Sequence, residues 1–147
     1  MYVKQIDEIK VTGIRIRTSN SKEVNTDTCQ IPSLWESFHT VLVPHLGEDS
    51  NIYGVYCNYE SNVDGHFDVV AGSDKFVGDL ERDTVIIQSG KYLVFEGKGD
   101  LPQVVTDVWS KIWSYFSSDE ANFTRVYTCD FELYKSSNEI EIYIAIK

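Results

Sequence analysis

Basic residues are scarce in this sequence, which has 13 lysines and arginines against 23 acidic residues and a net charge of −10. Direct nucleic-acid binding needs a basic stripe for the phosphates, and none is visible in the sequence. The charge balance therefore argues against nucleic acid as a direct partner. It is compatible with attraction of cations, although an acidic surface also serves solubility alone.

Long apolar runs are also missing. A membrane-spanning helix needs about 20 consecutive apolar residues, and charged residues interrupt every apolar stretch well before that length. The first 17 residues have neither the apolar centre of a signal peptide nor a lipidation motif. We therefore expect no membrane association and a cytoplasmic location.

Few residues offer metal-binding or nucleophilic chemistry. The three cysteines, Cys29, Cys57 and Cys129, form no CxxC pair and no Cys/His cluster, which argues against a zinc site. They are typical of reduced, mostly buried thiols. The sequence shows no Ser/His/Asp arrangement and no phosphate-binding loop. We accordingly expect no metal, no cofactor and no catalytic residue.

The apolar content, by contrast, is that of a folded protein. Hydrophobic residues make up 42% of the 147 positions and aromatic residues 13%. A chain of this length buries roughly 70% of its unfolded surface, so we expect a single domain over residues 1–147. Most aromatic side chains should be core, but such a stock also suits a pocket for flat ligands.

One arrangement of elements occurs twice in the sequence. A strand is followed by a helix with proline in its first turn and tryptophan on its apolar stripe, and then by a hairpin. The two copies span approximately 1–75 and 84–147. We therefore predict an α+β fold, in which duplicated β-α-β-β units related by a pseudo-two-fold axis form an antiparallel sheet with two main helices and a central ligand groove. The predicted elements are a strand at 2–17 bent near 5–8, a helix at 31–44, strands at 51–59, 66–72, 84–88 and 91–97, a helix at 100–116, and strands at 124–134 and 139–146.

Two acidic residues interrupt the apolar closing strands. Glu132 is followed two residues later by Tyr134, and Glu141 by Tyr143. Positions two apart on a strand share a face, so each strand should place a carboxylate beside an aromatic ring. One interpretation is a solvent-exposed face whose acids protect the sheet. The other is a site for an organic cation, held by charge and by cation–π attraction.

At this point the sequence resembles a known family, the effector-binding domain of bacterial transcription regulators of the AraC and MerR types, also called the GyrI-like domain. The resemblance covers nearly the whole chain. It is carried by the duplicated plan, by the Leu34-Trp35 helix, by the Trp109/Trp113 helix, and above all by FELY at 131–134 and EIYI at 141–144.

The resemblance implies a binding pocket between the two halves. Multidrug-binding members hold lipophilic cations against a glutamate walled by aromatic side chains. The match gives Glu132 the role of that glutamate and makes Glu141 and Tyr143 a second acid and aromatic. On the predicted strand, Tyr53 and Tyr59 share one face and Tyr56 takes the other. The remaining ligand-binding candidates are Tyr134, Trp109, Trp113, Tyr53, Tyr59 and Phe38.

Family regulators usually join this domain to a helix-turn-helix domain, whereas this sequence starts at the first strand, so we expect no DNA-binding domain. The chain thus resembles stand-alone members, such as those encoded on mobile gene cassettes or the small gyrase-modulating proteins. We expect a monomer or homodimer that senses or sequesters lipophilic cations, alone or with a separate DNA-binding or protein partner. The alternatives are a hydrolase of reactive natural products with Glu132 as general base, and a gyrase-inhibitor-like modulator of another protein.

Overall fold

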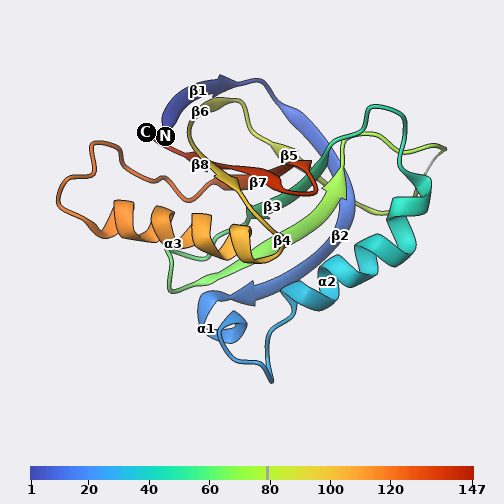
Figure 1. The fold of residues 1–147 in the computed structure, drawn as a ribbon, viewed down its shortest axis with the longest axis horizontal. Coiled ribbons are helices and arrows are strands. Elements are labelled where there is room, and N and C mark those ends of the chain that lie inside the picture. Colours follow the sequence, from blue (N-terminus) through green and yellow to red (C-terminus); the bar gives the residue numbers. More distant parts are fainter. Residues whose placement is uncertain (79) are drawn as a thin grey trace.

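The computed structural model describes residues 1–78 and 80–147 and forms one strongly curled sheet with helices along one side (Figure 1). The strands are β1 (Tyr2–Ile6), β2 (Ile9–Ser19), β3 (Ile52–Cys57), β4 (His66–Ser73), β5 (Asp83–Ile87), β6 (Gly90–Lys98), β7 (Cys129–Ser136) and β8 (Glu139–Ala145). The helical elements are α1 (Asn20–Glu23), α2 (Ile31–Ser37), η1 (Phe38–Leu42), η2 (Val43–His45) and α3 (Gln103–Ser117).

The eight strands form one antiparallel sheet in the order β1-β6-β8-β7-β3-β4-β2-β5. The units β2-α2-β3-β4 and β6-α3-β7-β8 occupy matching places on either side of the central β3–β7 pair. The strand that precedes each unit pairs with the other unit, because β1 pairs with β6 and β5 pairs with β2. The predicted α+β class and duplicated plan are therefore confirmed.

The predicted strand at 2–17 is divided in two. β1 and β2 are separated at Asp7 and Glu8, within the segment predicted to bend. They have different neighbours, since β1 pairs with β6 whereas β2 pairs with β4 and β5.

The first predicted helix is wrong in its second half. Only α2 is α-helical, and a wide π turn (η1) and a 3-10 turn (η2) follow it. A π turn has more residues per turn than an α-helix, so the 3.6-residue spacing no longer keeps side chains on one stripe. At α-helical spacing Val41 would share the buried stripe with Phe38, yet Val41 is 39% exposed, whereas Phe38 and Leu42 are fully buried.

The predicted strand at 124–134 is also too long. β7 begins at Cys129, and Tyr127 before it has a φ of 55°, in the left-handed region that breaks strand alternation. Arg125 forms only an isolated bridge with Ile146. Simple alternation along the predicted strand would put Arg125 on the face opposite Glu132. The change of direction instead brings Arg125 into the site described below.

The two faces of the sheet carry separate apolar clusters. On one face, side chains of α2, η1 and α3, including Leu34, Phe38 and Trp109, pack on β-strand residues such as Ile142. The other face is covered by the curl of the sheet itself and holds a second cluster of Tyr53, Val55, Tyr92, Phe131 and Tyr143, among others. None of the helices in the described ranges combines the length and apolarity of a membrane-crossing segment.

Candidate functional site

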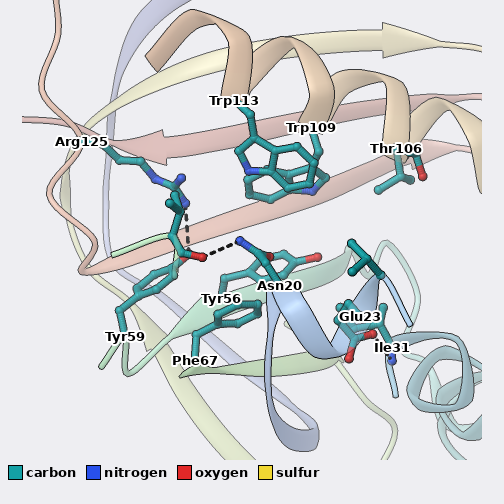
Figure 2. A pocket seen from close by; sticks show the side chains of 13 residues that line it. Asn20, Glu23, Ile31, Tyr56, Tyr59, Phe67, Thr106, Trp109, Trp113 and Arg125 are labelled. Atoms are coloured by element: carbon teal, nitrogen blue, oxygen red, sulfur yellow. Dashed lines mark hydrogen bonds between the residues drawn. The ribbon is translucent and has the colours of Figure 1, made fainter. Parts of the chain in front are cut away.

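A cavity of about 350 Å³ lies on the helical face of the sheet, between α3 and the segment that contains α1 and the start of α2 (Figure 2). Most of its wall is apolar or aromatic, with charged residues at opposite ends of the view. The lining residues come from both halves of the chain. They are Asn20, Glu23, Val24, Ile31, Tyr56, Tyr59, Val63, Phe67, Val105, Thr106, Trp109, Trp113 and Arg125.

Helix α3 provides one wall with two tryptophans. Trp109 and Trp113 are one helical turn apart and therefore point the same way, with ring centroids 5.9 Å apart. Both rings line the cavity, and Trp109 is buried whereas Trp113 is 43% exposed. The two rings give a flat ligand a surface that reaches from solvent to the interior.

Strands β3 and β4 provide the opposite wall. Tyr56 lies in β3 and Phe67 in β4, with ring centroids 5.8 Å apart. Tyr59 comes after β3 has ended, and Asn58 before it has a φ of 50°. That left-handed residue reverses the alternation, so Tyr59 lines the cavity with Tyr56. The prediction that Tyr59 shares a face with Tyr53 is therefore wrong.

Glu132 lies behind the aromatic wall and is 1% exposed. Its Oε2 accepts hydrogen bonds from the Tyr56 hydroxyl at 2.8 Å and from the Trp109 indole nitrogen at 2.7 Å. Its Oε1 accepts one from the Tyr134 hydroxyl at 2.8 Å. Two of these three donors, Tyr56 and Trp109, are also walls of the cavity. The carboxylate is thus joined to the cavity through the ring systems that line it.

Burial raises the pKa of Glu132, while the hydrogen bonds from Trp109, Tyr56 and Tyr134 act in the opposite direction and only partly offset it. The hydroxyl of Tyr56 likewise has a pKa well above its ordinary value, mainly because of burial and then because of the adjacent Glu132. An ionised Glu132 is held in a place where its charge is costly, and a cation nearby would lower that cost.

A second buried carboxylate lies two residues earlier on the same face of β7. Asp130 is fully buried and forms an ion pair with Arg125 at 2.8 Å. Its Oδ2 also accepts a hydrogen bond from the Tyr59 hydroxyl at 2.6 Å, and its Oδ1 accepts one from the backbone N–H of Ala145 at 2.8 Å. Asp130 thus fixes a cation, an aromatic side chain and the end of β8 at one point.

The structure brings only some of the predicted site residues together. Trp109, Trp113 and Tyr59 line the cavity, and Glu132 and Tyr134 form the hydrogen-bonded group behind it. Phe38 lies in the core of the helical face, with no exposed surface.

Glu141, Tyr143 and Tyr53 lie on the opposite face of the sheet. Phe131, which neighbours Glu132 on β7, pairs with Tyr143, so Tyr143 and Glu132 point to different faces. The Tyr143 hydroxyl donates to Glu141 at 2.9 Å, and Tyr53 packs in the same apolar cluster as Tyr143. The structure therefore does not bring these three residues to the cavity.

Sequence reasoning missed Tyr56, Arg125 and the segment around α1 as parts of the site. The predicted elements leave residues 18–30 outside any helix or strand, yet Asn20 and Glu23 line the cavity. Glu23 accepts backbone hydrogen bonds from Gln30 and Ile31 and so ties this segment to the start of α2. No group of three or more His, Cys, Asp or Glu side chains within 1–78 and 80–147 is placed to hold a metal ion.

A curled antiparallel sheet that carries two helices and an aromatic cavity on one face defines an effector-binding fold. Residues 3–146 match the family described as "Cass2: Integron-associated effector binding protein". The chain belongs to this family of small-molecule-binding proteins.

Solved structures and a curated protein are also similar to this chain. The integron cassette protein VCH_CASS2 from the mobile metagenome of Vibrio cholerae is 42% identical, with a TM-score of 0.93 over 99% of this chain and 95% of that one. YobU of Bacillus subtilis, whose name classes it with transcriptional regulators, is 26% identical over 99% of this chain and 97% of its own length. SAV2435, solved with bound tetraphenylphosphonium, is 21% identical and shares the fold with a TM-score of 0.70 over 99% of this chain and 93% of that one.

Proposed function

We propose that the protein binds lipophilic aromatic cations in the cavity beside Glu132, and so serves as a drug-sensing or drug-sequestering module. One contrast carries this proposal. Of the two buried carboxylates on β7, Asp130 has its own cation in Arg125, whereas Glu132 has three neutral donors and no ion pair with any described residue. The site therefore has a buried carboxyl group without a counter-ion, whose negative charge a bound cation would stabilise.

Hydrogen bonds connect the Glu132 carboxyl group with the aromatic wall of the cavity. A side chain that donates a hydrogen bond to an ionised carboxylate is polarised, and its aromatic ring then attracts a cation more strongly. Tyr56 and Trp109 are both donors to Glu132 and walls of the cavity. A cation stacked on these rings is attracted to the ring faces and to the carboxylate behind them.

The solved relative SAV2435, which has the same fold, is bound to tetraphenylphosphonium, a lipophilic aromatic cation. This supports the same ligand class here. Both oxygens of Glu132 already accept hydrogen bonds, an arrangement that favours a fixed charge over a general base that takes a proton from water. By binding such a cation the protein would sense or sequester it, either alone or together with a separate DNA-binding or protein partner.

The experiment compares tetraphenylphosphonium with tetraphenylborate, which has the same shape and the opposite charge. Binding is followed by quenching of Trp109 and Trp113 fluorescence and confirmed by calorimetry. We expect saturable binding of the cation only, weakened in Glu132→Gln by about 1–3 kcal/mol, the worth of a charge-assisted contact. Glu141→Gln, which removes a carboxylate on the opposite face, is the matched control. Equal affinity for both ions, or equal loss in both variants, would contradict the proposal.

A further inference from the structure

Arg125 is an unusual component of a cavity proposed for cations, because it brings a positive charge to the wall. Its side chain is only 6% exposed, and its guanidinium carbon lies 4.5 Å from the ring centroid of Tyr127, 5.8 Å from that of Tyr59 and 5.9 Å from that of Trp109. In Figure 2 it stands at one end of the cavity, beside the two tryptophan rings. The aromatic side chains and Asp130 hold it in one place.

Two of the three nitrogens of this guanidinium, Nη1 and Nε, make no hydrogen bond with a described residue. Nη2 donates to Asp130 at 2.8 Å and to the Tyr59 hydroxyl at 3.4 Å. Nε is buried and makes no hydrogen bond, and it is the only buried side-chain nitrogen or oxygen of the described residues in that condition. A ligand in the cavity cannot reach the buried Nε, whereas Nη1, which is not a buried atom, belongs to a cavity-lining side chain and can donate to an acceptor on the ligand.

We propose that Arg125 forms a second recognition point in the cavity, selective for a neutral oxygen acceptor, such as a carbonyl, on the bound cation. The inference rests on the proposed function, because the aromatic body of the ligand must first stack on the tryptophan wall. Arg125 and Trp109 are 5.9 Å apart, so a substituent on a ring stacked against Trp109 reaches the guanidinium.

The ion pair explains why the acceptor is neutral. Asp130 already neutralises the charge of Arg125. Burial, the largest single influence, lowers the Arg125 pKa, but Asp130, Tyr59 and Tyr127 together outweigh it, so that the pKa is raised and the guanidinium stays charged. A ligand carboxylate would gain from Arg125 but would be repelled by Asp130 and Glu132. A carbonyl oxygen accepts the same hydrogen bond without that repulsion.

The test uses two phosphonium cations of matched size, 4-acetylphenyl(triphenyl)phosphonium and 4-isopropylphenyl(triphenyl)phosphonium, with tetraphenylphosphonium as the parent compound. The measured quantity is the ratio of the two dissociation constants. We expect the wild-type protein to bind the acetyl compound about tenfold more tightly, as for a hydrogen bond to a charged donor. In Arg125→Lys the charge that Asp130 needs is kept while Nη1 and the planar fork are lost, and the ratio should fall to about one.

Arg17→Lys is the matched control, because Arg17 also pairs with a carboxylate, Asp68 at 3.0 Å, but lies outside the cavity. It should keep the wild-type ratio. A wild-type ratio near one with normal binding of the parent cation would overturn the acceptor site while the proposed function stands, as would a tenfold ratio that survives in Arg125→Lys. If the parent cation fails to bind, the proposed function itself falls, and this inference falls with it.

Discussion

Gly54 of β3 and Glu132 of β7 are paired across the centre of the sheet, and the carboxylate occupies the space that a side chain at position 54 would need. A Cβ at Gly54 would lie 2.5 Å from Oε1 of Glu132 and 3.0 Å from the ring of Trp35. The missing side chain of one half of the fold therefore makes room for the charged group of the other. This close approach is the reason for glycine in the middle of a central strand.

Gly54→Ala should consequently destabilise the protein by about 1–3 kcal/mol, the usual cost of forcing extra volume into a packed core. It should also weaken tetraphenylphosphonium binding, because the Glu132 side chain has to move. Urea unfolding measures the first effect and fluorescence titration the second. In a Glu132→Ala background the space is free, so the cost of Gly54→Ala should become much smaller. The same cost in both backgrounds would show that the clash lies elsewhere.

The raised pKa of Glu132 predicts how stability depends on pH. Because the folded-state pKa lies above the ordinary value of 4.5, the native state binds a proton more readily than the unfolded state. The contribution of this group is most favourable at a pH below the unfolded pKa and is lost as the pH rises through the folded pKa. Within that window the slope approaches about 1.4 kcal/mol per pH unit.

Glu132→Gln should therefore match the stability of the wild type at about pH 4 and exceed it near pH 7. Glutamine can still accept hydrogen bonds from Trp109 and Tyr56 but carries no charge. Denaturant unfolding across this range measures the difference. A Glu132→Gln protein that loses stability relative to the wild type as the pH rises would contradict the assigned direction.

Burial also predicts the reactivity of the cysteines. Cys57 and Cys129 are paired across β3 and β7, and burial raises the pKa of Cys57 to about 11 and that of Cys129 to about 12. Thiol reagents attack the thiolate, so at pH 8 the native protein should react quickly through Cys29 alone, which is partly exposed. Ellman's reagent should therefore detect one fast thiol in the native protein and three after unfolding. Cys29→Ser should abolish the fast phase, and a fast phase that persists would disprove the assignment.

The fold followed from local patterns that tertiary contacts did not override. Alternation of apolar residues marked the strands, and the polar stretch between 135 and 139 closes the β7–β8 hairpin as predicted. The same alternation placed Tyr134 beside Glu132, and the two are hydrogen bonded. Spacing of apolar residues also gave α3 and its two tryptophans.

The composition of the site was less predictable, for two physical reasons. Asn58 and Tyr127 adopt left-handed conformations. Asparagine tolerates this region without requiring it, and tyrosine seldom adopts it, so neither residue by itself indicated that Tyr59 and Arg125 would turn toward the cavity. The faces of Glu132 and Glu141 depend on the register of the β7–β8 pair, which a one-residue shift would reverse. The sequence shows that each strand has an acid and a tyrosine, but not that the two acids lie on opposite sides of the sheet.

The Arg125–Asp130 pair predicts a non-additive stability effect. Asp130→Asn keeps one oxygen, which can still accept from the Ala145 N–H, but it turns an NH2 group toward Tyr59 and leaves Arg125 as a buried cation without a counter-ion. The loss should be about 3–5 kcal/mol. Adding Arg125→Met removes that cation while its apolar chain keeps packing on Tyr127, so the double variant should recover most of the loss. Urea unfolding of the wild type, both single variants and the double variant measures the coupling.

If the double variant is as unstable as Asp130→Asn alone, the damage comes from the contacts that Asp130 makes with Tyr59 and Ala145. In that case the carboxylate serves mainly to anchor the end of β8, and the guanidinium is held in the cavity by its aromatic neighbours.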